Sequence, residues 1–343
     1  MNAIGSFVYH LCSRPRDALR WYPLMSVYYL TYACELRCRH CSDGNGEPYH
    51  RLPAKTLPGA KVIDLLRIIR RHSDFLVLTG GEPLLHPDFA EVLRGLKELK
   101  FRGAVLTTNG LSIDRFLSEV ADSIQYLVLS LQTLDSKRGD AGYGAGNGVH
   151  ERVMANIECA ARHPGRKYEI IISSVVTPKN IPDLYEVYRF CQERGFRLAA
   201  CPQLVGVKAH PAVVGNQAYR QFIEILNAEK RKSGAIQGTV DFLRYMRDLR
   251  KFSCRPFTML VVSPVGQVFY PCLELGQFAG NLLQQPDLQR LRQQGLQRFG
   301  PQPDCDTRCH SACALGFSRL LANPFSLVHE AALIARSRIK KYL

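Results

Sequence analysis

From residue 26 onward, short apolar segments typical of strands alternate with longer segments of helical periodicity. In residues 59–71, for example, Val62, Leu65, Leu66 and Ile69 occupy positions i, i+3, i+4 and i+7, which is the spacing of one helix face. Six such strand–helix units predict a parallel sheet with right-handed connections, either doubly wound or curved into a partial barrel. The expected strands cover residues 26–33, 75–78, 103–106, 126–131, 168–176 and 196–200.

Three cysteines lie directly behind the first expected strand. Cys34, Cys38 and Cys41 form a C-x3-C-x2-C run on one loop. A [4Fe–4S] cluster normally takes four cysteines, so three leave one iron open for a substrate or cofactor. Structural zinc sites usually contain two C-x2-C pairs or added histidines, and an x3-x2 run with no nearby fourth cysteine fits them poorly. The spacing therefore favours an iron–sulfur cluster over zinc.

Two more motifs follow the next expected strands: Thr79–Pro83 reads T-G-G-E-P, and Thr107–Gly110 reads T-T-N-G. Through the cysteine run and the Gly-Gly-Glu-Pro motif, about one strand–helix unit apart, residues 26–315 resemble the radical S-adenosylmethionine (SAM) superfamily. The resemblance implies a (β/α)6 partial TIM barrel with its chemistry at the carboxyl ends of the strands. It also implies that SAM chelates the open iron. A reductant such as flavodoxin or ferredoxin then supplies one electron, and SAM splits into methionine and a 5′-deoxyadenosyl radical that removes a hydrogen atom from the substrate.

The same resemblance implies which residues contact SAM. Gly80, Gly81 and Glu82 hold its ammonium group, and the glycines let the backbone approach a ligand closely. His40 stands where the family usually has an aromatic residue that touches adenine. Two strand-end pairs are further candidates, Asn109 and Ser130 for the SAM carboxylate and ribose, and Gln132 and Gln203 for the substrate. Asn109 and Ser130 can equally be strand caps.

A second group of cysteines follows residue 250: Cys254, Cys272, Cys305, Cys309 and Cys313. Residues 258–262 and 267–270 between the first two predict a hairpin that presents them together, and from spacing alone zinc can occupy four of these thiols. Cys254 is followed by eleven residues, then by Gly266, and later by the pair Pro271-Cys272. This order resembles the twitch or SPASM extension of radical SAM enzymes. The full two-cluster extension needs about seven cysteines, so we expect one auxiliary [4Fe–4S] cluster. Its expected ligands are Cys254, Cys272, Cys309 and Cys313, with Cys305 as a competing ligand.

Both chain ends are amphipathic and basic. Ile4, Phe7, Val8 and Leu11 share one helix face, and residues 327–339 have a similar apolar arc. Such helices can lie on anionic membranes or can dock onto the barrel. The net charge of +15 is spread along the chain without a long basic run, so nucleic acid is not indicated. We found no secretion signal, which predicts a cytoplasmic protein, with peripheral contact at the inner face of the membrane as a further expectation.

Residues 137–148 contain five glycines and no apolar periodicity, so we expect a mobile loop at the barrel mouth. The expected division of the chain is an N-terminal amphipathic extension (1–25), the radical SAM core (26–215), a bridging helical segment (216–253), an auxiliary cluster domain (254–315) and a basic C-terminal helix (316–343). The favoured substrate is an amphipathic or lipid-like small molecule, such as an isoprenoid or tetrapyrrole. A peptide substrate is the alternative, and a zinc-stabilised nucleic-acid-binding protein is the more distant one.

Overall fold

The computed structural model describes residues 3–13, 20–42, 46–301 and 309–342. Its large sheet has nine strands in the order β11-β10-β9-β1-β2-β3-β4-β5-β6. Neighbouring strands from β1 to β6 pair in parallel throughout, which confirms the six expected strands and their order. These strands are β1 (Met25–Tyr29), β2 (Phe75–Thr79), β3 (Gly103–Thr108), β4 (Tyr126–Ser130), β5 (Glu169–Val176) and β6 (Arg197–Pro202).

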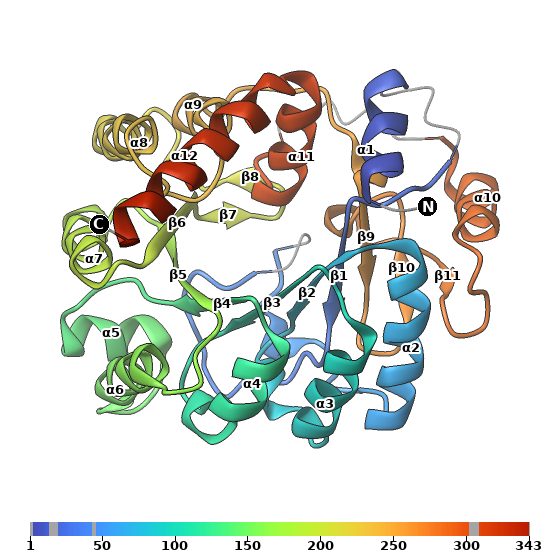
Figure 1. The fold of residues 1–343 in the computed structure, drawn as a ribbon, viewed down its shortest axis with the longest axis horizontal. Coiled ribbons are helices and arrows are strands. Elements are labelled where there is room, and N and C mark those ends of the chain that lie inside the picture. The colour runs from blue at the N-terminus through green and yellow to red at the C-terminus, as the bar shows by residue number, and fades with distance from the viewer. Residues whose placement is uncertain (1–2, 14–19, 43–45, 302–308, 343) are drawn as a thin grey trace.

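Helices lie along the outer side of the curved sheet (Figure 1). They are α2 (Gly59–His72), α3 (Phe89–Leu99), α4 (Leu117–Ser123), α6 (Val149–Arg162) and α7 (Ile181–Arg194). The predicted apolar face of α2 is fully buried, and Leu65 and Leu66 belong to one core with Leu76 and Leu78 of β2. Each such side chain contributes roughly 1.5–3 kcal/mol when removed from water. The helices therefore hold the sheet from outside and leave its inner face for the site.

The C-terminal strands continue the same sheet. β9 (Met259–Val262) pairs in parallel with β1, and β10 (Gln267–Phe269) and β11 (Phe278–Asn281) follow it in antiparallel order. The expected hairpin is confirmed, with Gly266 at a positive φ of 84° in its turn. Leu260 and Val262 point into the main core, whereas Val261 joins a smaller cluster on the other face. The segment is thus built into the sheet of the barrel.

The prediction of a mobile loop at residues 137–148 is wrong, because the structure forms helix α5 (Ser136–Tyr143) there. The side chain of Asp135 caps its first turn by accepting a hydrogen bond from the Arg138 amide at 2.8 Å. Gly144 ends the helix in the left-handed conformation, with φ 60° and ψ 38°. The glycines thus supply helix-end geometry, which a test for apolar periodicity does not detect.

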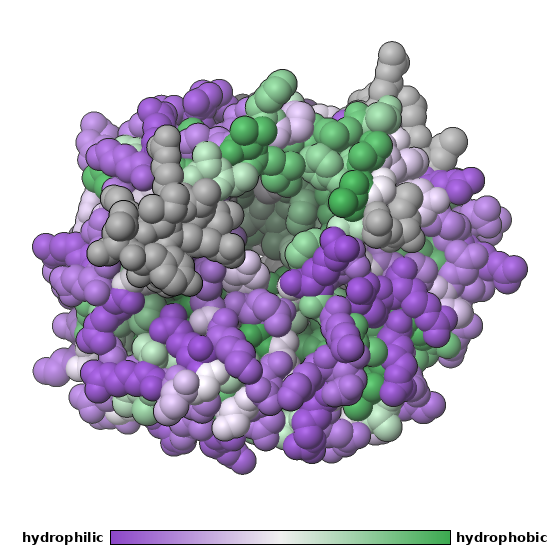
Figure 2. Space-filling model, viewed as in Figure 1, coloured by the Kyte–Doolittle hydropathy of each residue, from purple (hydrophilic) through white to green (hydrophobic). Residues whose placement is uncertain are grey.

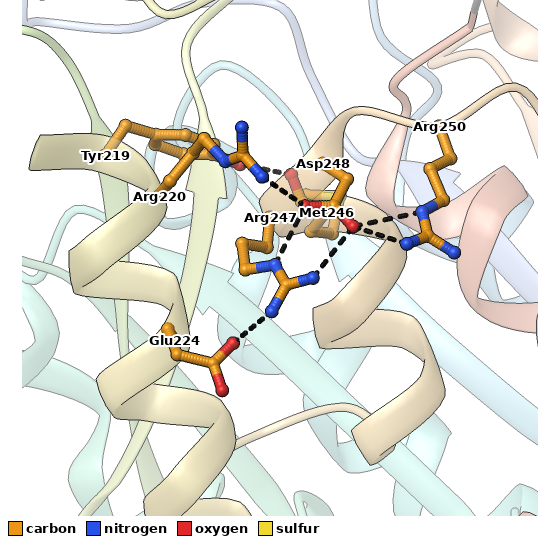
Figure 3. Close-up of polar contacts among 7 residues, drawn as sticks. All are labelled: Tyr219, Arg220, Glu224, Met246, Arg247, Asp248 and Arg250. Atoms are coloured by element: carbon orange, nitrogen blue, oxygen red, sulfur yellow. Dashed lines mark hydrogen bonds and ion pairs between the residues drawn. The ribbon is translucent and has the colours of Figure 1, made fainter. Parts of the chain in front are cut away.

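Two helices beyond the barrel, α8 (Gln217–Lys230) and α9 (Val240–Asp248), are joined by a cluster of charged side chains (Figure 3). Asp248 accepts hydrogen bonds from Arg247 at 2.8 Å and from Arg250 at 2.7 Å, and it pairs with Arg220 of α8 at 3.3 Å. Arg247 also pairs with Glu224 of α8. The pKa of Asp248 is lowered to about 2, chiefly by the hydrogen bonds from Arg247, and partial burial opposes this shift.

The two ends of the chain differ in how they pack. In α1 (Ala3–Cys12), Ser6 and His10 are buried, whereas Ile4 and Val8 are 67% and 50% exposed. The expected basic C-terminal helix consists of two helices, α11 (Ala312–Ala322) and α12 (Phe325–Tyr342). In α12, Glu330 forms a 2.6 Å ion pair with the buried Lys230 of α8, so this helix docks onto the body. No helix in the described parts is both long and apolar enough to cross a membrane.

The remaining elements are short or lie at the rim. They include the hairpin β7 (Leu204–Val205) and β8 (Lys208–Ala209), helix α10 (Leu288–Phe299), which packs on β11, and short 3-10 helices.

Candidate functional site

The Gly-Gly-Glu-Pro turn is hydrogen-bonded to the end of β1, where the cysteine loop begins. The Gly81 amide donates to the Thr31 carbonyl at 2.8 Å, and the Glu82 amide donates to the Ala33 carbonyl at 2.7 Å. A Cβ atom on Gly80 would lie 2.3 Å from the Thr31 oxygen, and one on Gly81 would lie 2.4 Å from the carbonyl oxygen of Tyr32. Both glycines are therefore required for this close backbone approach, which fixes the first residues of the cysteine loop.

Glu82 is fully buried and joins the ends of β2 and β3. Its carboxylate accepts hydrogen bonds from the Leu84 amide at 3.0 Å, the Thr108 hydroxyl at 2.7 Å and the Asn109 amide at 2.7 Å. Burial raises the pKa of Glu82 to about 7, and the three hydrogen bonds partly oppose that rise. A carboxylate offers about four acceptor positions, so one remains for a donor such as an ammonium group.

The three cysteines of the loop are half-buried and influence one another. The Cys41 amide donates to the Cys38 carbonyl at 3.1 Å. Burial raises the pKa of Cys34 and of Cys38 to about 12, and the charge of Cys41 adds to the shift of Cys38. Burial and mutual repulsion keep these thiols protonated in the absence of a ligand. A positively charged group bound between them would stabilise the three thiolates.

Among the described residues, no three histidine, cysteine, aspartate or glutamate side chains converge closely enough to hold one metal ion. A [4Fe–4S] cluster makes a different demand, since each cysteine binds a separate iron of the cube. Three thiols on one loop at this spacing form a donor set of the right chemistry for such a cluster.

The other candidate SAM ligands lie around the cysteine loop. His40 is half-buried, and burial lowers its pKa to about 4, so its ring is neutral near pH 7. The Asn109 side chain accepts the Leu111 amide at 2.8 Å and donates to Glu35 at 3.3 Å. Ser130 ends β4, and its carbonyl accepts the hydroxyl of Tyr143 at 3.3 Å. The Asn109 amide also donates to Glu82 at 2.7 Å. Asn109 and Glu82 therefore lie close enough to contact one ligand.

The two candidate substrate contacts have structural partners. The side chain of Gln132 accepts the Val175 amide at 2.7 Å and so joins the ends of β4 and β5. The Gln203 amide donates to the Val176 carbonyl at 2.9 Å, which continues the pairing beyond β6. Both residues lie at the carboxyl ends of the strands, as expected.

The C-terminal cysteines gather partly around one cavity. Cys272 and Cys313 line it together with Glu274, and Tyr29 of β1 forms part of its wall. Cys254 lies near enough to disfavour ionisation of Cys272. Cys309 is half-buried and is not among the residues of the cavity wall, and Cys305 lies outside the described residues. Glu274 lies in a short 3-10 helix (Leu273–Leu275), and a single acidic residue carries no spacing signal in the sequence.

Most of the wall of this cavity is apolar, and Val27, Met259, Val261 and Phe269 contribute to it. Arg255 also lines the cavity, but its guanidinium donates to the carbonyls of His10 and Ser13 at the end of α1. Near α1 and α11, hydrophobic residues surround a hollow on the face shown in Figure 2, and most of the remaining face is hydrophilic. α11 carries Cys313, so this helix borders both features.

Three tyrosines pack between the two groups of cysteines. The Tyr29 and Tyr49 hydroxyls are 3.0 Å apart and their rings stack, and the Tyr32 ring stacks on Tyr49 at 6.0 Å between centroids. Tyr32 lies two residues before Cys34, and the charge of Cys313 contributes to the raised pKa of Tyr29. The tyrosines are spread from residue 29 to residue 49, so no local sequence pattern indicates this cluster.

The fold and the site define a class of protein: a partial barrel of parallel strands with a cysteine loop after its first strand and a Gly-Gly-Glu-Pro turn after its second. Residues 28–191 match the family model described as "Radical SAM superfamily". These residues belong to the radical SAM superfamily, whose chemistry uses SAM and a [4Fe–4S] cluster.

Two curated relatives illustrate the sequence similarity. A probable GTP 3′,8-cyclase of Sulfolobus acidocaldarius is 24% identical over 237 residues, which cover 68% of this chain and 71% of the relative. Molybdenum cofactor biosynthesis protein 1 of Bos taurus is 33% identical over 108 residues, which cover 31% of this chain. That match spans only 17% of the bovine protein.

Among solved structures, SuiB of Streptococcus suis bound to S-adenosylmethionine superposes with a TM-score of 0.63 at 21% identity. The superposition covers 79% of this chain and 66% of SuiB. At this identity the likeness concerns the fold, and it supports the partial barrel.

Proposed function

We propose that this protein is a radical SAM enzyme in which Cys34, Cys38 and Cys41 hold the SAM-binding [4Fe–4S] cluster. The observation that carries the proposal is the convergence of the cysteine loop and the Gly-Gly-Glu-Pro turn on the end of β1, through the Gly81 and Glu82 hydrogen bonds. When bound, the cluster supplies the electron that splits SAM into methionine and the radical that takes hydrogen from the substrate. Glu82 offers its free acceptor position to the SAM ammonium.

The remaining SAM contacts are proposed from position. Asn109, which shares a hydrogen bond with Glu82, is proposed to bind the SAM carboxylate, and Ser130 the ribose. The neutral ring of His40 can stack on adenine or hydrogen-bond to it, because burial keeps the imidazole uncharged. Gly80 and Gly81 keep the backbone of the turn close to the loop.

The test is SAM cleavage by anaerobically reconstituted, reduced protein. Replacing Cys34, Cys38 and Cys41 together with alanine should abolish 5′-deoxyadenosine formation and remove about four irons per chain. Cys159→Ala is the matched control, because Cys159 is an exposed cysteine on α6 and belongs to neither group of cysteines. Undiminished 5′-deoxyadenosine formation by the triple variant would overturn the proposal.

We further propose an auxiliary [4Fe–4S] cluster held by Cys254, Cys272, Cys309 and Cys313. The shared cavity of Cys272 and Cys313, with Cys254 close to Cys272, supports it. Cys272→Ala should lower bound iron by up to about four per chain and leave SAM cleavage measurable. Cys305→Ala should retain the full iron content, and a loss of iron in that variant would make Cys305 a ligand. Zinc at full occupancy in anaerobically isolated protein would contradict the auxiliary cluster.

The substrate that the cavity favours is amphipathic or apolar. Its wall is mostly apolar, and the guanidinium of Arg255 already has two carbonyl partners. A nucleoside triphosphate needs several cations to balance its phosphates, which this wall does not provide among the described residues. The apolar part of an isoprenoid or tetrapyrrole leaves fewer unpaired charges against this wall than phosphates do, and the cavity of about 80 Å³ takes only a part of such a molecule.

GTP is the second candidate, because the relative that covers 68% of the chain is a probable GTP 3′,8-cyclase. A peptide substrate is the third. The experiment compares SAM cleavage with GTP, with a detergent-solubilised isoprenoid and with a short synthetic peptide, using deuterated substrates to follow transfer into 5′-deoxyadenosine. Deuterium from the isoprenoid alone supports the amphipathic proposal, and deuterium from GTP or the peptide overturns it.

Contact with an anionic membrane remains a proposal for both chain ends. Ile4, Val8 and Leu11 of α1 point outward, and Leu327 and Val328 of α12 are exposed although Glu330 of the same helix pairs with Lys230. Exposed apolar residues beside basic ones favour the surface of anionic lipids. Ile4→Ser with Val8→Ser should reduce sedimentation with phosphatidylserine vesicles at low salt. Equal sedimentation of the wild-type protein with anionic and neutral vesicles would contradict it.

A further inference from the structure

The C-terminal end of α5 touches the middle of the cysteine loop. The Arg37 amide donates to the Tyr143 carbonyl at 2.8 Å, and the Arg39 amide donates to the Gly142 carbonyl at 3.3 Å. These two amides flank Cys38 on either side. The loop around Cys38 is therefore attached by its backbone to a helix that follows the fourth strand, about a hundred residues later in the chain.

The contact requires a glycine at the end of the helix. A Cβ atom on Gly144 would lie 2.4 Å from the Arg37 carbonyl oxygen, and Gly144 has a φ of +60°. Tyr143 is 3% exposed, and its hydroxyl donates to the Ser130 carbonyl at the end of β4. One residue thus binds a barrel strand through its side chain and the cysteine loop through its backbone.

α5 is in turn fixed on its other sides. The His150 amide of α6 donates to Asp140 at 2.7 Å, and the buried His150 ring forms a hydrogen bond with the Thr133 carbonyl at 2.9 Å. Arg138 forms a 2.9 Å ion pair with Asp183 of α7. The helix α5 is therefore held by β4, α6 and α7. Because its own position is fixed, it can fix the position of the loop.

The loop is also braced from within. The Arg37 guanidinium donates to the carbonyls of Cys34 at 2.6 Å and Leu36 at 2.9 Å. With the backbone of Arg37 held by α5, these bonds join Cys34 and Leu36 to one anchored residue, which directly precedes Cys38 in the chain.

We propose that α5 is a clamp for the cysteine loop, in which Gly144 and Tyr143 are positioning residues for Cys38. The proposal rests on the assignment of Cys34, Cys38 and Cys41 as cluster ligands. Without the clamp, the loop carries its cysteines on a longer unsupported segment, so the ligands must be ordered when the cluster binds and the cluster leaves more easily.

The test compares two glycines with the same backbone geometry. Gly195 ends α7 with a φ of +66°, and a Cβ atom there would meet nothing within 4 Å. Gly144→Ala and Gly195→Ala therefore introduce the same left-handed strain, but only the first pushes on the cysteine loop. Tyr143→Phe removes the hydroxyl bond to Ser130 and leaves the backbone contact in place.

Two measurements on the full chain decide the proposal. In the reconstituted protein, Gly144→Ala should release iron to a ferrous chelator about tenfold faster than Gly195→Ala, as expected when support for metal ligands is lost. It should also weaken the change that SAM causes in the electron paramagnetic resonance spectrum of the reduced cluster. In the apo protein, hydrogen exchange of residues 36–40 should accelerate in Gly144→Ala but not in Gly195→Ala. Tyr143→Phe should lie between the wild-type protein and Gly144→Ala.

The outcomes separate the clamp from the cluster assignment. Equal exchange of residues 36–40 and equal iron release in the two alanine variants would overturn the clamp. If wild-type protein and the triple cysteine variant hold the same iron, the cluster assignment fails. In that case, faster exchange in apo Gly144→Ala supports α5 as an anchor of the loop but overturns its role in holding a cluster.

Discussion

At the scale of single residues, the Gly-Gly-Glu-Pro motif is explained by packing as well as by ligand binding. Gly81 lies where a Cβ atom would be 2.4 Å from the Tyr32 carbonyl oxygen and 2.5 Å from that of Ala33. Glu82 uses three of its acceptor positions on the neighbouring strand ends. These residues therefore shape the start of the cysteine loop before any ligand arrives.

We predict that Gly81→Ala lowers the free energy of unfolding by about 2 kcal/mol, because two backbone segments must separate. Urea denaturation of the apo protein measures this. Gly316→Ala is the control: Gly316 lies inside α11 with nothing within 4 Å of its Cβ position, so alanine there should raise stability by roughly 0.5 kcal/mol. Similar effects of the two substitutions would show that the close approach is unimportant.

A second residue-scale prediction concerns Asp248. The pKa of Asp248 lies below its usual 3.8, at about 2, so its ion pairs stabilise the folded state fully above pH 4. That contribution is lost as the pH falls from about 4 to about 2, because protonation ends the pairing with Arg247 and Arg250. Asp248→Asn should lower unfolding free energy by about 1 kcal/mol at neutral pH, after solvent screening. The difference from wild type should shrink toward pH 2, and a constant difference across this range would contradict the assignment.

The sequence predicted the candidate site residues that lie close together in the chain and gave no signal for those that the fold brings together. Cys34, Cys38 and Cys41 share one short loop, so their spacing is visible directly. The positions of Tyr29 and Glu274 around the cavity of Cys272 and Cys313 depend on the pairing of β1 with β9, which joins residues more than two hundred positions apart. No local pattern contains that information.

At the scale of elements, hydrophobic periodicity located the strands and the outer helices because both bury one regular face. The same rule failed at α5, where Asp135, Gly144 and contacts with neighbours stabilise a helix that has little apolar surface. It also gave no orientation for α1, whose Ser6 and His10 are buried while Ile4 faces outward. Periodicity identifies a helix face, but the neighbours decide which face is covered.

The docking of α12 gives a prediction at this scale. The Lys230 ammonium is buried, donates to the Ile236 carbonyl at 3.0 Å and pairs with Glu330 at 2.6 Å. Glu330→Ala leaves a buried charge without its ionic partner and should lower unfolding free energy by about 3 kcal/mol. Lys230→Met combined with Glu330→Leu should recover most of this loss, because apolar residues of similar size can replace a buried pair. If the double variant is as unstable as Glu330→Ala, the buried charge is not the cause.

At the scale of the whole molecule, the strand between Cys254 and Cys272 is part of the barrel's own sheet. β9 pairs with β1 along four residues, and the Trp21 indole donates to the Met259 carbonyl at 2.9 Å. Leu260 and Val262 share the main core with Leu76 and Leu78. The sequence suggested a separate cluster domain because the strand–helix alternation stops after residue 250, and it could not show that a hairpin extends a sheet begun far earlier in the chain.

This continuity predicts how the apo protein behaves. If β9 and β10 are stabilised by the barrel core, their amides should exchange with deuterium about as slowly as those of β1, with or without iron. Cys272→Ala should lose auxiliary iron but keep that protection, because its backbone lies beyond the paired residues of β10. Hydrogen-exchange mass spectrometry of residues 259–269 and 25–29 in the same sample measures both. Rapid exchange in β9 beside a protected β1 would show that the cluster, and not the shared sheet, folds the C-terminal segment.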